Sequence, residues 1–396
     1  MTIDPQTLIQ RLSVEELCQT AEDYFRAHSD PTPHIAKPFF DHQQSPEMLQ
    51  NLGLLLSGPH LAKGMSVLDF GAGACWISRL LTQMQCRTIS CDPSPTALAM
   101  GEQAFKDYPV MGKPIAEPTF LPFDGRHIAL PDASVERILC FDAFHHVPNQ
   151  GEILAEFARV LSPGGIAGFS EPGRYHSQTP ISQHEMTHFD VLENDIRVED
   201  IFKIARRFGF TDIAIKLLGN LDLSLDEYRR IIQPDWRAWR LERQMVNYLR
   251  QVTTNKTIFF LHKGPYRPDS RSSQGLDHQL EVAPKSTRLA LDTPLPLTVY
   301  IANRGQSRWL CENFHDIGVV KLGVHLCDGD QRVLNWDFLR CGLPQILEPG
   351  ERLTLKVELV FPHRGHFCLA VDLVAEYICW FEHVGAKPAW VDVEVY

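Results

Sequence analysis

Two adjacent histidines and two carboxylates follow predicted strands and have the side chains needed for acid–base chemistry. Asp142, His145 and His146 lie in CFDAFHHVP, directly after an apolar run, and Glu171 ends the run GIAGFSE. In an open α/β sheet, ligands lie beyond the carboxyl ends of the strands, so we expect these side chains at one crevice. A histidine can accept a hydroxyl proton near neutral pH while a carboxylate orients its ring. We therefore predict catalytic roles for His145, His146 and Glu171; the alternative is that one histidine caps the strand and the other packs on the next helix.

The segment VLDFGAGACWISRLL, residues 67–81, has the pattern of a strand, a glycine turn and an amphipathic helix. Asp69 lies at the end of the apolar run, and Gly71 and Gly73 allow the backbone to approach a ligand closely. The start of the following helix would offer free N–H groups to a carboxylate or phosphate. A dinucleotide site of the GxGxxG type needs a small residue where Trp76 stands, which disfavours NAD.

Asp92 ends a second predicted strand, RTISCD. A carboxylate at this place in an α/β sheet binds ribose hydroxyls, which any nucleoside cofactor carries. The pattern therefore predicts a nucleoside cofactor without naming which one.

Four motifs in chain order resemble those of class I S-adenosylmethionine-dependent methyltransferases. They are DFGAG at 69–73, CDPS at 91–94, FDG followed by LPDAS at 123–134, and LSPGG at 161–165. The resemblance implies a doubly wound, seven-stranded Rossmann-like α/β fold with S-adenosyl-L-methionine as the methyl donor. The paired histidines resemble those of sugar and small-molecule O-methyltransferases of this class.

Carried over position by position, the resemblance places Gly71 and Gly73 against the methionine part of the donor and Asp92 on its ribose. Phe123 and Asp124 would border the adenine. The cofactor-binding residues implied in full are Asp69, Gly71, Gly73, Asp92, Phe123, Asp124 and Asp142. Taken singly, each glycine fits an ordinary tight turn and each aspartate a helix cap.

A second group of histidines, His176, His184 and His188, follows the predicted fifth strand. Carboxylates are not arranged around them in a recognisable metal-binding pattern, so we predict no metal site. We expect this segment to be an acceptor loop or plain surface, and assign the stretch after it, up to the sixth strand, a structural role.

The first sixty residues form a predicted helical extension. A helix is expected over 12–30, with a capping box of Ser13 and Glu16, and another over 46–56. The proline-rich stretch 31–40 is predicted to be extended. This leader could be a lid over a pocket or a brace on the sheet, and we favour the brace.

The remaining boundaries follow from changes of pattern. The methyltransferase domain is expected over 61–264, with a helical insert at 223–250, and a linker over 265–284. In the insert, the aromatic residues are expected on an inward face; these are Tyr228, Trp236, Trp239 and Tyr248. A lid over the acceptor and a helix lying on a membrane surface are the alternatives.

Residues 285–396 contain alternating strand-like segments separated by turn residues, which predicts an all-β, immunoglobulin-like sandwich. The region resembles modules of bacterial polysaccharide-related proteins, which implies glycan binding. Trp309, Trp336 and Trp380 are then candidate stacking platforms, unless they lie in the sandwich core.

The formal net charge of −11 argues against a nucleic-acid partner. The sequence contains no signal peptide and no apolar run of membrane-spanning length, although peripheral membrane contact stays open. With ten cysteines and no CxxC pair, we expect reduced thiols and a cytoplasmic location.

These observations predict an S-adenosylmethionine-dependent O-methyltransferase acting on a saccharide or glycolipid intermediate. The alternatives are a methyltransferase of a small secondary metabolite and a non-catalytic glycan-binding protein. The oligomeric state is left open.

Overall fold

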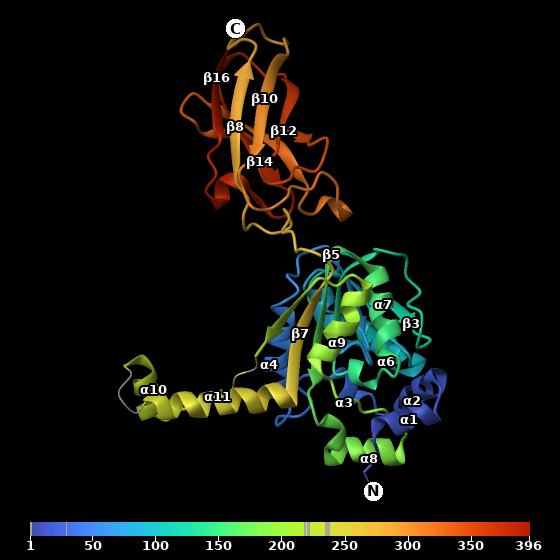
Figure 1. Cartoon of the computed structure of the whole chain (residues 1–396). Coiled ribbons are helices and arrows are strands. Elements are labelled where there is room, and N and C mark those ends of the chain that lie inside the picture. Colours follow the sequence, from blue (N-terminus) through green and yellow to red (C-terminus); the bar gives the residue numbers. More distant parts are fainter. Residues whose placement is uncertain (1, 29, 218, 220–221, 234–237) are drawn as a thin grey trace. The chain divides into compact units, whose positions relative to one another are not determined.

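The computed structural model describes residues 2–28, 30–217, 219, 222–233 and 238–396. The chain divides into two compact units (Figure 1). Unit 1 comprises Met1–Leu61 and Met65–Tyr266, and unit 2 comprises Ala62–Gly64 and Arg267–Tyr396.

Unit 1 is built on a seven-stranded sheet with the order β3-β2-β1-β4-β5-β7-β6. Neighbouring strands from β3 to β5 pair in parallel, whereas β7 is antiparallel to both β5 and β6. The strands are β1 (Ser66–Phe70), β2 (Arg87–Asp92), β3 (Thr119–Pro122), β4 (Val135–Phe141), β5 (Leu161–Pro172), β6 (Asp212–Lys216) and β7 (Lys256–His262). This confirms the predicted doubly wound, seven-stranded, Rossmann-like fold of unit 1.

The strand order creates the crevice in which the site lies. The chain runs outward from β1 to β2 and β3 and then returns to place β4 on the other side of β1. Connections on the two sides of β1 therefore diverge beyond the carboxyl ends of β1 and β4, which is where α/β sheets bind ligands. The intervening helices are α5 (Trp76–Gln83), α6 (Pro95–Asp107), α7 (Gln150–Val160) and α9 (Val198–Ala205).

The leader consists of four helices: α1 (Pro5–Arg11), α2 (Val14–Ala27), α3 (Thr32–Ile35) and α4 (Ser45–Leu56). The predicted capping box at the start of α2 is confirmed, because Ser13 and Glu16 bond each other's backbone N–H groups. The expectation of an extended stretch over 31–40 is wrong at α3. There Pro33 occupies the first turn of a helix, where the missing N–H of a proline costs nothing.

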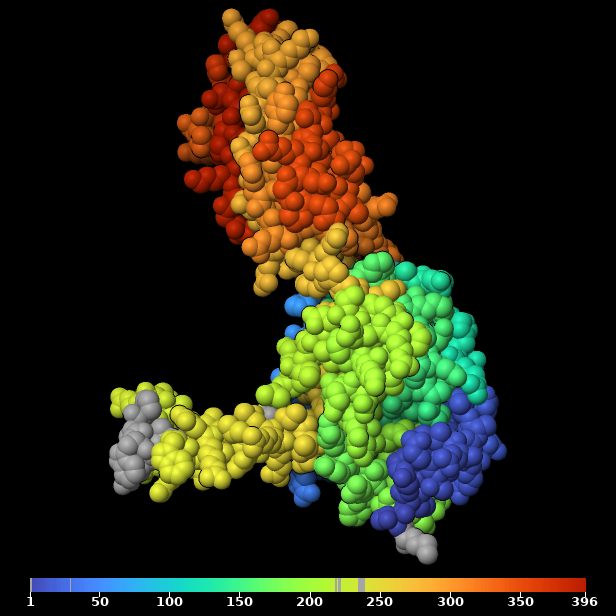
Figure 2. Space-filling view, viewed as in Figure 1, coloured from blue at the N-terminus to red at the C-terminus, as the bar shows by residue number. Residues whose placement is uncertain are grey.

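The helical insert contains α10 (Leu225–Ile232) and α11 (Ala238–Asn255), which stand out from the rest of unit 1 in Figure 2. Tyr228 and Trp239 are each about half exposed. The predicted inward aromatic face is therefore wrong at these two positions, since α10 and α11 offer them no core. Trp236 lies outside the described residues. The short helix α8 (Pro180–His188) precedes a segment without regular structure, residues 191–195.

Unit 2 contains two sheets, one with the order β13-β10-β8 and one with the order β12-β11-β14-β16-β9, to which β15 is added at β14. Buried apolar residues of both sheets, such as Val299, Val324 and Leu369, belong to one core cluster. The strands are β8 (His278–Pro284), β9 (Arg288–Leu289), β10 (Leu295–Asn303), β11 (Val320–Asp328), β12 (Val333–Gly342), β13 (Arg352–Leu359), β14 (Gly365–Ala375), β15 (Cys379–Trp380) and β16 (Ala389–Val395). Strand β8 occupies the last part of the expected linker, because it pairs along its whole length with β10.

The tryptophans of unit 2 differ in exposure. Trp309 and Trp380 are buried, as expected for tryptophans of a sandwich core, so neither offers a free face for a sugar. Trp336 on β12 is about half exposed.

Among the residues that the structure describes, no helix combines the length and the apolar character needed to cross a bilayer.

Candidate active site

A cavity of about 380 Å³ lies in unit 1 beyond the carboxyl ends of β1 and β4. The last residues of these strands, Phe70 and Phe141, form part of its wall. Of the predicted site residues, the following line the cavity: Gly71, Gly73, Asp92, Phe123, Asp142 and His146. The structure therefore brings together residues from four separate sequence segments.

Gly71 shapes the turn between β1 and α5. Its φ is +72°, in the left-handed region that favours glycine, and its N–H donates to the carbonyl oxygen of Cys91 on the neighbouring strand. A Cβ atom at this position would lie 2.2 Å from the Cβ of Ala143. Position 71 therefore requires glycine, both because of its backbone conformation and because a side chain would have no space.

Asp92 connects the glycine turn to the next helix. Its carboxylate accepts hydrogen bonds from the N–H groups of Gly73 (2.7 Å) and Ser94 (2.8 Å). Burial raises the pKa of Asp92 to about 6, although these two hydrogen bonds act in the opposite direction. A nearly buried carboxylate that lines a cavity is well suited to accept hydrogen bonds from ribose hydroxyls.

Asp69 lies beneath the cavity wall. Its buried carboxylate accepts a 2.6 Å hydrogen bond from the hydroxyl of Ser78 on α5, and burial raises its pKa to about 7. The geometry makes Asp69 a brace between β1 and α5, so the structure separates it from the residues that face the cavity.

Of the two residues predicted to border the adenine, one lines the cavity and the other does not. Phe123 lines the cavity, and so does Trp76 on the other side of the glycine turn. Asp124 is exposed and outside the lining; its carboxylate accepts hydrogen bonds from the N–H groups of Arg126 and His127 and closes a turn.

The leader helix α2 forms part of the cavity wall through Tyr24 and Phe25, among other residues. It is anchored by the buried Glu22, which accepts hydrogen bonds from the hydroxyls of Ser94 (2.7 Å) and Thr96 (2.7 Å) at the start of α6. Burial alone would raise the pKa of Glu22, but these bonds and the nearby Arg26 lower it to about 2. The favoured interpretation of the leader as a brace alone is therefore wrong, since it also encloses the cavity.

Asp142 follows β4 with φ of +49° and lines the cavity. Its carboxylate forms an ion pair with Lys256 at the start of β7. Lys37 of the leader also lines the cavity; burial lowers its pKa, and the charge of Asp142 acts against that change.

Of the two adjacent histidines, His146 is the one that lines the cavity. Its Nδ1 lies 2.7 Å from the carbonyl oxygen of Leu192, so Nδ1 carries the proton and donates it in this hydrogen bond. Nε2 is then left as a proton acceptor, as a general base requires.

His145 and Glu171 lie behind this wall. The buried carboxylate of Glu171 accepts hydrogen bonds from Nδ1 of His145 (2.7 Å) and from the N–H groups of Ala143 (3.1 Å) and Phe144 (2.9 Å). Burial, together with the charge of His146, lowers the pKa of His145 well below its usual value. Neither residue lines the cavity, and the catalytic role expected for them stays a prediction.

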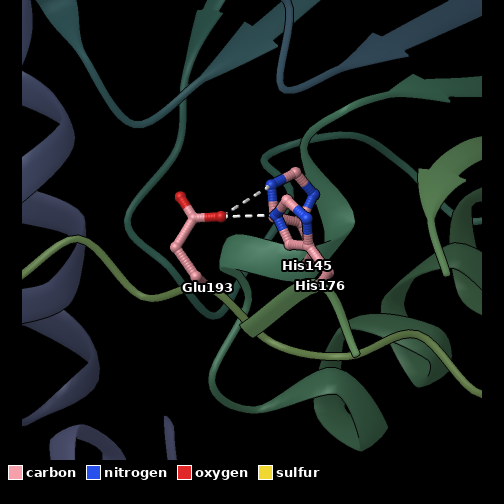
Figure 3. Close-up of side chains that lie close together, drawn as sticks. All are labelled: His145, His176 and Glu193. Carbon is pink, nitrogen blue, oxygen red and sulfur yellow. Dashed lines mark hydrogen bonds and ion pairs between the residues drawn. The ribbon is translucent and has the colours of Figure 1, made fainter. Parts of the chain in front are cut away.

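Glu193 is a residue that the sequence analysis missed. Its carboxylate lies 2.6 Å from Nε2 of His176 and 3.7 Å from Nε2 of His145, as Figure 3 shows. Burial acts to raise the pKa of Glu193, but the hydrogen bond with His176 and the charge of His146 outweigh it and lower the pKa to about 2. No sequence motif points to Glu193, because it reaches the site from the irregular segment after α8.

The residues present fit S-adenosylmethionine on two structural grounds. The glycine turn lines the cavity at Gly71 and Gly73, where a ligand can approach the backbone closely, and the buried carboxylate of Asp92 faces the same cavity. Both are features that a nucleoside with an amino-acid tail requires of its site.

Comparison with known proteins finds similarity to methyltransferases. Residues 68–169 match the family model of a methyltransferase domain. The chain is 28% identical over 188 residues to a protein of Mycolicibacterium smegmatis named "Probable S-adenosylmethionine-dependent methyltransferase", a match that covers 45% of this chain and 69% of that protein. It is 26% identical over 192 residues to the arsenite methyltransferase of Aquipseudomonas alcaligenes, covering 46% of this chain and 54% of that protein.

Among solved structures, the chain is similar to phosphoethanolamine N-methyltransferase 2 of Haemonchus contortus in complex with S-adenosylmethionine. The TM-score is 0.39 at 19% identity, and the match covers 55% of this chain and 52% of the other.

Proposed function

We propose that this S-adenosylmethionine-dependent methyltransferase transfers its methyl group to a hydroxyl of a polar, saccharide-like acceptor, with His146 as the general base. The observation that carries the proposal is the cavity itself, in which the Gly71 turn, Asp92 and His146 face one space. When bound, S-adenosylmethionine supplies a methyl group on a sulfonium, which needs alignment and exclusion of water more than further activation.

The chain's own residues supply three functions. Asp92 accepts hydrogen bonds from the nucleoside, the Gly71 turn admits the amino-acid tail, and α2 excludes water. His146 accepts the hydroxyl proton of the acceptor at Nε2, because its Nδ1 is held by the carbonyl of Leu192. His145 and Glu171 act through position: the Glu171 carboxylate fixes the turn 143–145 that carries His146.

A polar acceptor is supported by four polar side chains in the lining, which also contains apolar residues. Tyr24, His34, Lys37 and Glu185 add hydrogen-bonding groups to the cavity wall. A polyhydroxyl compound can pair with several such groups at once, whereas an apolar acceptor would leave them unpaired at a cost of about 1–3 kcal/mol each.

Arsenite is not supported as the substrate. A soft metalloid is held by several thiolates. Among the described residues that line the cavity, Cys18 alone carries a thiol, and burial raises its pKa to about 11.

Unit 2 is proposed to be an immunoglobulin-like module that binds the glycan portion of the acceptor. Two features support it: its two sheets share one apolar core, and Trp336 on β12 presents an exposed indole. Sugars stack on such faces, so Trp336→Ala is expected to weaken retention of the full chain on immobilised polysaccharides. A cytoplasmic location remains a prediction from the sequence.

The donor site is tested by calorimetry with S-adenosylhomocysteine. The wild-type chain and Asp107→Asn, a change on the exposed end of α6, are expected to bind alike, whereas Asp92→Asn is expected to bind at least ~10-fold more weakly. Absence of binding to the wild type would refute the proposal.

The acceptor is tested with isotopically labelled donor and a panel of saccharides, glycolipids and small phenols. Replacement of His146 by alanine is expected to reduce transfer by about 10²–10⁴-fold and to leave S-adenosylhomocysteine binding within a few-fold. The exposed His42→Ala serves as the control. Transfer to phenols alone would favour a secondary-metabolite enzyme, and sugar binding without transfer would favour a glycan-binding protein.

A further inference from the structure

Three side chains at the edge of the cavity, of which Glu193 lines it, bring potential metal ligands together. One ring nitrogen each of His145 and His176 and one carboxylate oxygen of Glu193 all lie within 4.8 Å of one another, and Figure 3 shows the three side chains. They come from the turn after β4, from the segment after β5 and from the segment after α8, so three loops converge on one point.

The separations are close to those of a metal site. Zinc lies about 2.0–2.2 Å from imidazole nitrogen and carboxylate oxygen, so ligand atoms around it are about 3.3 Å apart. Here the Glu193 oxygen lies 3.7 Å from His145 Nε2 and 2.6 Å from His176 Nε2. The third separation, between the two imidazole nitrogens, is at most 4.8 Å, so changes of up to about 1.5 Å by rotation about side-chain bonds would complete the geometry.

The His145 ring is already oriented for coordination. Its Nδ1 lies 2.7 Å from the Glu171 carboxylate and therefore carries the ring proton, so the lone pair of Nε2 points toward Glu193. A lone pair facing a carboxylate without a proton between them is unfavourable, and a cation removes that conflict. Metal-binding histidines in general donate their second N–H to a carboxylate in this way.

Two of the three ligands are nearly buried, and the third is partly exposed. The side chains of His145, Glu193 and His176 are 6%, 8% and 23% exposed. The other Glu193 oxygen lies 3.7 Å from Nδ1 of His146, the proposed base. A cation here would therefore fix the carboxylate that lies beside that histidine.

We propose that His145, His176 and Glu193 bind one divalent transition-metal ion of the zinc type. Two imidazoles and one carboxylate favour such an ion over magnesium or calcium, which prefer all-oxygen sites. Three protein ligands leave a further coordination position for water or another small ligand. This replaces the expectation of no metal site and is independent of the identity of the acceptor.

The test uses the untagged full chain after chelator treatment, since a polyhistidine tag would bind the same ions. Cobalt(II) is titrated as a spectroscopic probe, and zinc binding is measured by calorimetry. One equivalent of cobalt with visible absorption of a four- or five-coordinate ion is expected, displaced by zinc but not by magnesium. Zinc is also expected to raise the melting temperature of the chain.

Two variants and two controls make the result specific. His176→Ala and Glu193→Gln are expected to weaken zinc binding by at least ~100-fold and to abolish the rise in melting temperature. His184→Ala and His188→Ala, on the exposed face of α8, are expected to bind zinc like the wild type. Circular dichroism of each variant establishes that it is folded.

Two outcomes would overturn the proposal: no stoichiometric binding by the folded wild type, or equal losses in His176→Ala and His184→Ala. The first would leave the cluster as a hydrogen-bonded network, and the second would assign binding to surface histidines. Neither outcome bears on S-adenosylhomocysteine binding, which is measured separately.

Discussion

The side chain of Asp92 illustrates how burial tunes a binding group. Ribose hydroxyls donate hydrogen bonds to the ionised carboxylate, whereas burial raises its pKa to about 6 in the free protein. The folded-state pKa is above the ordinary value of 3.8, so the folded chain takes up a proton as the pH falls through 6 and must release it to bind the nucleoside.

We therefore expect S-adenosylhomocysteine affinity to rise as the pH increases to about 6 and then to level off, with binding roughly tenfold weaker at pH 5 than at pH 7.5. Calorimetry at a series of pH values measures this. Asp92→Asn should show weak and pH-independent binding; a pH dependence that survives in this variant would assign it to another group.

Gly71 is expected to tolerate no larger residue. Gly71→Ala combines left-handed backbone strain with a clash against Ala143, and is expected to destabilise unit 1 by about 2–4 kcal/mol in urea unfolding. The double variant Gly71→Ala/Ala143→Gly removes the clash but not the strain, and should recover part of the loss. Equal stability of the single variant and the wild type would contradict this account.

At the scale of elements, continuous apolar runs were the most informative signal. The run SVLDF coincides with β1 and RTISCD with β2, because each strand is buried over nearly its whole length in the sheet. Strand β12 was not predicted, since its residues Val333–Asp337 are exposed and show no apolar run or alternation.

The sequence predicts the residues of the candidate site only where they lie near the end of a strand. Gly71, Asp92 and His146 lie at or shortly after the carboxyl ends of β1, β2 and β4, so their place at the crevice follows from strand order. Glu193 and the α2 residues reach the cavity through long-range packing, which leaves no local pattern. His145 and His146 are adjacent in sequence, yet one is buried and the other faces the cavity. The backbone path of the turn after β4 decides which of the two lines the cavity.

The anchoring of α2 by Glu22 can be tested by unfolding. Glu22→Ala removes its hydrogen bonds with Ser94 and Thr96 and is expected to destabilise unit 1 by about 2–3 kcal/mol in urea unfolding. The neighbouring Asp23→Ala, on the exposed face of α2, is expected to cost less than about 0.5 kcal/mol. Similar effects of the two changes would show that Glu22 is not an anchor.

At the scale of the whole molecule, two units with separate apolar cores share one chain. Differential scanning calorimetry is expected to resolve two transitions, because each core can melt on its own. S-adenosylhomocysteine binds only unit 1 and should raise only one of the two melting temperatures. A single transition, shifted as a whole by the ligand, would contradict this independence.

The anchor of the leader has one further consequence for the molecule. Glu22 bonds the hydroxyl of Ser94, whose N–H bonds Asp92, which in turn bonds the N–H of Gly73. One continuous chain of contacts thus joins the first helices of the protein to the turn that receives the donor, and coupling between two such events is reciprocal. Donor occupancy should therefore shield the amino-terminal helices from limited proteolysis, and their removal should in turn shorten the residence time of the donor.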